Sequence, residues 1–182
     1  MVILRQLRRT PFQFVSVPGI VLVVSTPGFA AVYLTAGEAQ QVIFPGQNFT
    51  AFPLILSEEE QKALKKKYDL PVHFVKQKIW RTDHGDFFII DKVIGKHELI
   101  TYAVGINSDG SIRQIEIMDY REAYGDEIRH KRWRRQFIGK TTASPLKFNE
   151  DIKNISGATL SCRHVTEGVK RILSLYERVL KK

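Results

Sequence analysis

The sequence predicts an α+β fold: an antiparallel sheet meander packed with helices and ending in a long C-terminal amphipathic helix. Four apolar runs between residues 72 and 120 are separated by short turn signals and not by helices, which is typical of consecutive antiparallel strands. Residues 160–180 then repeat apolar side chains at helical spacing. A chain of 182 residues has room for one domain of ordinary size, so these elements are expected to share one core.

The first 30 residues have the features of an export signal that precedes this domain. Residues 1–9 carry three arginines and no acid, and an apolar stretch over 12–24 follows. The stretch is shorter than the about 20 apolar residues that a membrane-spanning helix needs. The small residues that end at Ala30 are typical of a signal-peptidase cleavage site. We expect a signal peptide over 1–30 and one domain over 31–182, in the periplasm or elsewhere outside the cytoplasm. An uncleaved N-terminal membrane anchor and an ordinary buried strand are the alternatives.

Two short helices are expected before the sheet, each opened by a capping box. Thr35 and Glu38 have the required spacing, and helical periodicity follows until a Pro-Gly pair. Ser57 and Glu60 repeat that spacing and open a helix to about Tyr68. Its acids lie in the first turn and its lysines in the last, as the helix dipole favours.

The expected strands are residues 72–80, 87–94, 99–106 and 112–118. In the third of them large and small side chains alternate, with Tyr102, Val104 and Ile106 on one face and Thr101, Ala103 and Gly105 on the other. The small face would let another layer or a ligand approach closely, and packing is the preferred interpretation.

A basic segment over residues 126–137 is expected to be helical. Its aromatic side chains, Trp133 and Phe137, are four residues apart and therefore share one face. Its basic side chains are Arg129, His130, Lys131, Arg132, Arg134 and Arg135. Basic residues among aromatic ones can bind nucleic acid, but a solvated face anchored to the core by the aromatic pair is preferred. The final helix, 160–180, is expected to pack its apolar stripe on the sheet.

Charge and composition narrow the classes of function. Hydrophobic residues are 43% and charged residues 26%, which excludes wholesale disorder and a multi-span membrane protein. The formal charge is +9, and removal of residues 1–30 would leave 25 basic residues against 19 acidic ones. Such an excess suits a nucleic acid, an anionic membrane surface or a phosphorylated ligand as a partner. With Cys162 alone and no paired-ligand spacing among five histidines, we expect neither a disulfide nor a metal site.

The segment just before the last helix carries the candidate chemistry. It reads Ser156-Gly157-Ala158-Thr159-Leu160-Ser161. Small residues leading into a helix N-terminus offer unpaired backbone N–H groups and the positive end of the dipole, which favour a phosphate. Hydroxyl residues at a helix start are more often N-caps, so the residues alone favour capping and leave a phosphate cradle as the alternative.

Residues 156–159 resemble the Ser/Thr-Gly-Ala-Thr motif of FMN-binding domains. This family occurs in the C subunit of sodium-translocating NADH:quinone oxidoreductase, in the G subunit of the Rnf complex and in small exported proteins. In it a flavin transferase joins the FMN phosphate to the last Thr through a phosphoester, so the resemblance implies FMN as the cofactor and Thr159 as the acceptor. It covers about residue 72 to the end, through the Asp109-Gly110 turn, the 120–125 segment, Trp133, Phe137, Gly139 and Lys140.

The resemblance implies a site with two parts. Ser156, Gly157, Ala158, Leu160 and Ser161 would shape the phosphate end, and Glu122, Tyr124, Gly125, Trp133 and Lys140 would surround the flavin. Lys140 would stabilise negative charge on the phosphate or on reduced flavin.

Three positions depart from the family pattern. Lys153 stands three residues before the motif, where the family often has an acid, and the nearest acid is Asp151. Ala123 replaces a Thr, and Cys162 replaces a small hydroxyl residue. The lysine leaves open whether FMN is attached covalently. For the cysteine, a small helix residue is preferred over a reactive thiol.

The expected function is that of an exported electron-transfer flavoprotein, a carrier or redox subunit more than a stand-alone enzyme. It would pass electrons between a membrane respiratory or quinone-linked complex and an extracytoplasmic acceptor, with no nucleic acid partner and with membrane association left open. The alternative is a module that binds FMN or another phosphorylated ligand non-covalently, without turnover.

Overall fold

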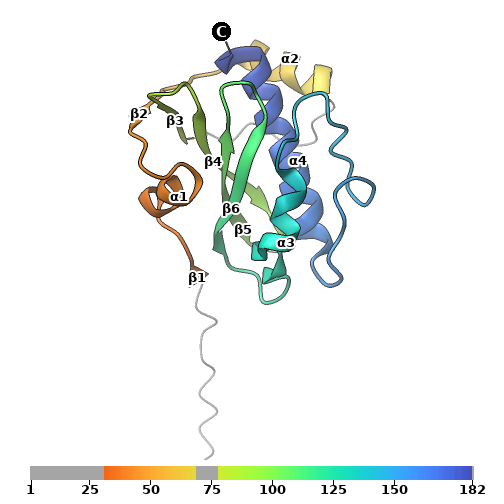
Figure 1. Ribbon diagram of the computed structural model, residues 1–182. Helices are drawn as coiled ribbons and strands as arrows, with labels where there is room; N and C mark the ends of the chain where they lie inside the picture. Colours follow the sequence, from red (N-terminus) through yellow and green to blue (C-terminus); the bar gives the residue numbers. More distant parts are fainter. Residues whose placement is uncertain (1–30, 69–77, 182) are drawn as a thin grey trace, which may run out of the picture.

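The computed structural model describes residues 31–68 and 78–181, and in these residues six strands form one antiparallel sheet (Figure 1). The strand order is β1-β6-β5-β4-β3-β2. The strands are β1 Ala31–Val32, β2 Phe49–Ala51, β3 Lys78–Thr82, β4 Phe87–Ile94, β5 Leu99–Ile106 and β6 Ile112–Tyr120. The expected meander is therefore confirmed in β3 to β6, while the segment before it supplies both edges of the sheet. The first part of the expected 72–80 strand lies outside the described residues.

The helices also follow the α+β expectation. They are α1 Ala36–Ile43, α2 Glu58–Tyr68, α3 Lys131–Arg134 and α4 Thr159–Leu175, which continues as a π-helical turn, Tyr176–Leu180. Both capping boxes are formed: the Thr35 hydroxyl accepts the Glu38 N–H, and the Ser57 hydroxyl accepts the Glu60 N–H at 3.2 Å. No helix in the described ranges has the length and apolar character needed to cross a membrane.

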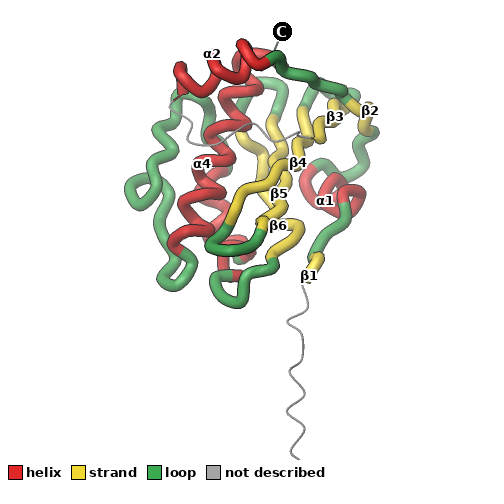
Figure 2. The backbone as a smooth tube through the Cα atoms, turned by 180° about the vertical axis from the view of Figure 1, so that it is seen from behind, coloured by secondary structure: helices red, strands yellow, loops and turns green. Residues whose placement is uncertain are grey.

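The main core lies between the sheet and α4, which runs along one face (Figure 2). The predicted α4 stripe is buried there, for example at Val165, Val169 and Ile172. From the sheet, β5 contributes the predicted large side chains, among them Tyr102 and Val104, which are fully buried. Burial of the apolar surface of these side chains is the main contribution to the stability of the packed sheet and helix.

The other face of the sheet is covered by α1. At Gly105 of β5, an added Cβ would lie 2.3 Å from Ile43 Cγ2 and 2.9 Å from Phe44 Cε2. No side chain fits at that distance, so the glycine permits α1 to approach the sheet. The small face of β5 therefore admits a second packed layer, which confirms the preferred interpretation over a ligand at this place.

The prediction of a single helix over 126–137 is wrong. The segment forms a 3-10 turn, Asp126–Arg129, then α3, then a second 3-10 turn, Arg135–Phe137, with His130 extended at φ −63° and ψ 131° between the first two. Ile128 and Trp133 are both buried, and on a continuous helix they would point about 140° apart. The break at His130 lets both reach the core. The aromatic pair behaves as expected, with the Trp133 and Phe137 rings 5.2 Å apart.

A buried polar cluster joins α4 to the sheet. Tyr102 donates a hydrogen bond to Asp91 at 2.8 Å, and Arg171 of α4 donates to the same carboxylate oxygen. Gly168 makes room for it, because a Cβ there would lie 2.2 Å from the Tyr102 hydroxyl. Burial, together with the charge of Asp91, raises the pKa of Tyr102 well above its usual value. The cluster fixes the position of α4, whose first residue belongs to the site.

Candidate functional site

The motif loop ends in an uncapped helix N-terminus. Ala158 is the N-cap of α4 and makes no side-chain cap, and the first helical bond runs from the Cys162 N–H to the Ala158 carbonyl at 2.9 Å. In the described part of the chain, the N–H groups of Thr159, Leu160 and Ser161 meet no acceptor. The expectation that a hydroxyl caps this helix is therefore wrong, and three donors and the positive end of the dipole are free for an anion.

Thr159 is the first residue of α4, and its side chain is exposed. Its hydroxyl accepts a hydrogen bond from Asn154 Nδ2 at 3.1 Å. Gly157, at φ +88°, makes the turn that brings Asn154 back to Thr159, and no atom lies within 4 Å of the place where its Cβ would be. The hydroxyl of Thr159 is thus held by one side chain and open to a large reactant.

The 120–125 segment packs directly against the motif loop. The Tyr120 hydroxyl donates to the Tyr124 carbonyl at 2.5 Å and lies 3.1 Å from Ser161 Oγ. A Cβ on Gly125, which has φ +92°, would lie 3.0 Å from Ala158 Cβ. Burial raises the pKa of Tyr120, so its hydroxyl stays protonated and can donate. Two segments that the family resemblance singled out separately, Tyr124-Gly125 and the motif, are therefore neighbours.

Glu122 points to a different part of the molecule. Its carboxylate accepts the N–H groups of His97 at 2.6 Å and Glu98 at 3.0 Å, and a Cβ on Gly95 would lie 2.5 Å from it. Partial burial raises the pKa of Glu122, but the backbone donors lower it by more, and the net direction is down. The Glu122 carboxylate therefore stabilises the turn between β4 and β5.

A pocket of about 590 Å³ opens between the α3 region and the segment 153–155 that leads into the motif. It is lined by Glu127, His130, Arg132, Trp133, Gln136, Lys153, Asn154 and Ile155. Trp133 Nε1 donates to the Lys153 carbonyl at 2.9 Å, and the Lys153 N–H donates to Gln136 Oε1 at 2.8 Å, so the two walls are tied together. This volume is in the usual range for cofactor sites, and Asn154 links the pocket to Thr159.

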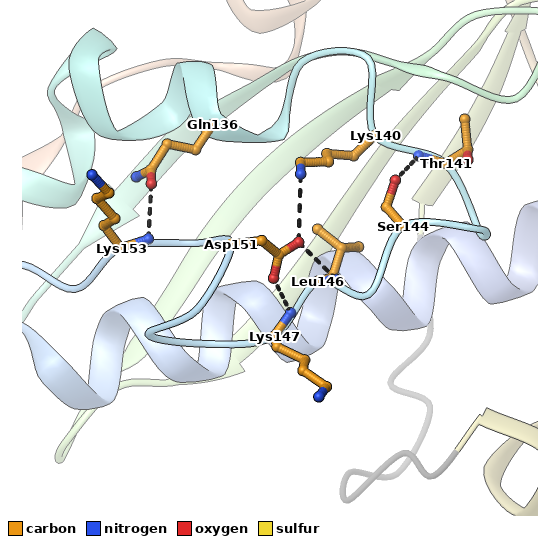
Figure 3. A network of polar contacts seen from close by, with 8 residues as sticks. All are labelled: Gln136, Lys140, Thr141, Ser144, Leu146, Lys147, Asp151 and Lys153. Atoms are coloured by element: carbon orange, nitrogen blue, oxygen red, sulfur yellow. Dashed lines mark hydrogen bonds and ion pairs between the residues drawn. The ribbon is translucent and has the colours of Figure 1, made fainter.

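Lys140 lies in a separate polar network (Figure 3). Its ammonium pairs with Asp151 at 3.4 Å, and Asp151 also accepts the N–H groups of Leu146 and Lys147. Asp151 therefore holds the loop that precedes the motif, and it is not free to replace the acid that is missing at Lys153. The residues that line the pocket do not include Lys140.

Cys162 is fully buried in the first turns of α4. Burial raises the pKa of its thiol, and the charge of Glu127 adds to the rise. A buried thiol of raised pKa is a poor nucleophile. The preferred interpretation of Cys162 as a small helix residue is confirmed.

The basic segment contributes two of its arginines to the fold. The Arg129 guanidinium lies 3.3 Å from the centre of the Tyr33 ring. Arg134 donates to the Ile115 carbonyl at 2.7 Å and pairs with Glu116. The exposed members are His130, Lys131, Arg132 and Arg135, and of these His130 and Arg132 line the pocket.

Four site residues were missed at the sequence level. They are Tyr120, Glu127, Gln136 and Asn154. Asn154 was accessible in principle, because Gly157 between it and Thr159 predicts a turn. Tyr120 lies in the 120–125 segment that the resemblance covers but was not assigned to the site, whereas Glu127 and Gln136 reach the site only through the packing of the α3 region.

Comparison with protein families agrees with this geometry. Residues 95–174 match the model of the FMN-binding domain family. By this match, residues 95–174 correspond to an FMN-binding domain. The matched range holds β5, β6, the pocket, the motif loop and most of α4, and the cofactor of this domain is FMN. A search of the curated proteins finds no match to the chain.

The residues present in this FMN-binding domain fit the cofactor. An anion would meet the three free N–H groups at the start of α4, and Trp133 and Ile155 offer apolar walls for a flat ring. Glu127 Oε2, in the same pocket, is buried and lacks a hydrogen-bond partner within the described residues. This oxygen can accept a hydrogen bond from a donor that a ligand supplies.

Proposed function

We propose that this protein is an exported electron carrier whose FMN is joined by a phosphoester to Thr159. It passes electrons between a membrane respiratory or quinone-linked complex and an acceptor outside the cytoplasm. The observation that carries the proposal is the exposed Thr159 hydroxyl at the uncapped start of α4, inside an FMN-binding domain.

The loop supports attachment at Thr159. The Asn154 amide donates to Oγ1, so the hydroxyl proton is directed elsewhere and an oxygen lone pair remains for attack on phosphorus. Overall, Thr159 and FMN lose one water as the Oγ1–phosphorus bond forms. The phosphate charge that remains would be stabilised by the free N–H groups of α4.

The other residues bind and orient the cofactor. Ser156, Gly157, Ala158, Leu160 and Ser161 form the phosphate end, with Tyr124 and Gly125 beside it, and Trp133 lines the pocket of the ring. Glu122 and Lys140 support the site through the neighbouring turn and loop. When bound, FMN supplies one- and two-electron transfer, and the protein sets its potential.

The test is the intact mass of the full chain made together with a flavin transferase. We expect a shift of one FMN less water, mapped to the peptide that contains Thr159, and fluorescence on a denaturing gel. Thr159→Ala should abolish both, while Thr142→Ala, an exposed threonine in another loop, should change neither. Unmodified wild-type protein under conditions that modify another family member would refute covalent attachment.

One observation favours a second candidate, a module that binds FMN without a covalent bond. Lys153 occupies the position of the family's acid, and Asp151 is committed to the preceding loop. For such a module, Thr159→Ala should keep the yellow colour under native conditions and lose little affinity. A covalent carrier would lose the colour that survives denaturation.

Export is proposed on the sequence of residues 1–30, which lie outside the described residues. The mature protein should begin near residue 31 and be released with the periplasmic fraction. A chain that retains its first residues and sediments with membranes would instead be an anchored carrier. N-terminal sequencing of fractionated protein separates the two.

A further inference from the structure

The pocket beside Thr159 contains one carboxylate among the described residues that line it. Glu127 provides it from the 3-10 turn Asp126–Arg129, and the other ionisable side chains on the walls are His130, Arg132 and Lys153. Glu127 Oε2 is closed to solvent and has no partner in the described part of the chain.

Three neutral donors on the pocket walls have other partners, and within the described residues no side-chain donor of His130, Arg132 or Lys153 bonds Glu127 Oε2. Trp133 Nε1 donates to the Lys153 carbonyl, Gln136 Nε2 donates to the Trp133 carbonyl at 3.1 Å, and Asn154 Nδ2 donates to Thr159. A buried carboxylate oxygen without a donor is unfavourable, and few native side chains retain one without a functional reason. Glu127 is therefore prepared for a donor that a ligand brings.

We propose that Glu127 is a positioning residue that accepts a hydrogen bond from the imide N3–H of the flavin. The oxidised isoalloxazine ring has one N–H donor, and its other polar edge atoms are acceptors, which a carboxylate would repel. Rotation about the last side-chain bond of Glu127 can present either oxygen. The proposal rests on the proposed function only in placing the flavin ring in this pocket.

The proposal also accounts for Lys153. In the family an acid often precedes the motif by three residues, whereas here the two positions face the same pocket with opposite charge: Glu127 is acidic and Lys153 basic. The carboxylate near the motif thus comes from the 3-10 turn instead of from position 153.

The test is equilibrium binding of FMN and of N3-methyl-FMN to the full chain expressed without a flavin transferase. The wild type should bind FMN about 10- to 100-fold more tightly than the methylated analogue, the value of one hydrogen bond to a charged group. Glu127→Ala should bind both flavins equally, and Glu127→Gln should discriminate less than the wild type. Asp126→Asn, an exposed neighbour outside the pocket lining, should behave as the wild type.

A second measurement excludes a merely structural role. Glu127→Gln removes an unpaired charge, so the melting temperature of the flavin-free protein should stay the same or rise while FMN affinity falls. Full discrimination by Glu127→Gln would mean that the methyl group is excluded by size, and it would overturn the proposal. Unchanged FMN affinity in both variants would overturn it as well. Absence of FMN binding by the wild type would overturn the placement of the ring in this pocket, whereas attachment at Thr159 is decided separately by the mass shift.

Discussion

Thr159 depends on one exposed neighbour for its orientation. The Asn154 amide reaches Thr159 Oγ1 only because Gly157 turns the chain between them at a positive φ. A non-glycine residue at that φ would be strained. The reactivity of the acceptor is therefore a property of a six-residue loop and not of the threonine alone.

Asn154→Ala should slow the attachment of FMN about 2- to 10-fold, because it removes one neutral hydrogen bond that orients the acceptor. Its thermal stability should change little, since both side chains are exposed. The rate is measured by the time course of the mass shift with purified flavin transferase. Asn48→Ala is a matched control that removes a comparable exposed bond, from Asn48 to Asp83 at 2.8 Å. Equal rates for the wild type and Asn154→Ala would contradict this role.

At the scale of elements, the contact between α1 and β5 has no spare room. Gly105→Ala should destabilise the protein by about 1–3 kcal/mol, because its methyl group would overlap Ile43 and Phe44. Gly37→Ala, in α1 with nothing within 4 Å, should instead stabilise by about 0.5–1 kcal/mol through helix propensity. Urea unfolding of both variants gives the two free energies. A neutral Gly105→Ala would show that α1 can move away from the sheet.

The elements differ in how far the sequence could predict them. The strands over 87–94, 99–106 and 112–118 and α4 carry their periodicity over many residues, and the structure confirms them. The 126–137 segment has a helical pattern in the sequence. However, Ile128 and Trp133 both pack into the same core, and the helix is interrupted at His130 because a continuous helix would point them apart. The motif loop was found by resemblance, whereas its partners Tyr120 and Glu127 come close only through packing. Side-chain contacts between distant segments leave no local pattern to read.

For the whole molecule, three buried phenols predict loss of stability at high pH. Burial raises the pKa of Tyr102, Tyr120 and Tyr176 above the unfolded value of 10.0. A raised folded pKa gives stability that is fully present below pH 10 and is lost as the pH rises toward the folded pKa. The free energy of unfolding should therefore fall above about pH 10.

Tyr102→Phe isolates the largest of these contributions. It should lower stability at neutral pH, because Asp91 loses a donor, and it should also flatten the decline above pH 10. Tyr124→Phe, whose side chain is 84% exposed, is the control and should reproduce the wild-type curve. Urea titrations between pH 7 and about pH 11 make the comparison. An unchanged slope in Tyr102→Phe would contradict the assignment.

The pairing of β1 with β6 determines where the chain enters the domain. Ala31 lies opposite Tyr120, and the Tyr120 hydroxyl lies 3.1 Å from Ser161 in the first turn of α4. Whatever precedes Ala31 therefore joins the domain at the acceptor end. If residues 1–30 stay attached as an anchor, the flavin would be tethered close to the membrane and could move only within a small volume beside it. Its effective concentration toward a membrane partner would then be high without any added affinity.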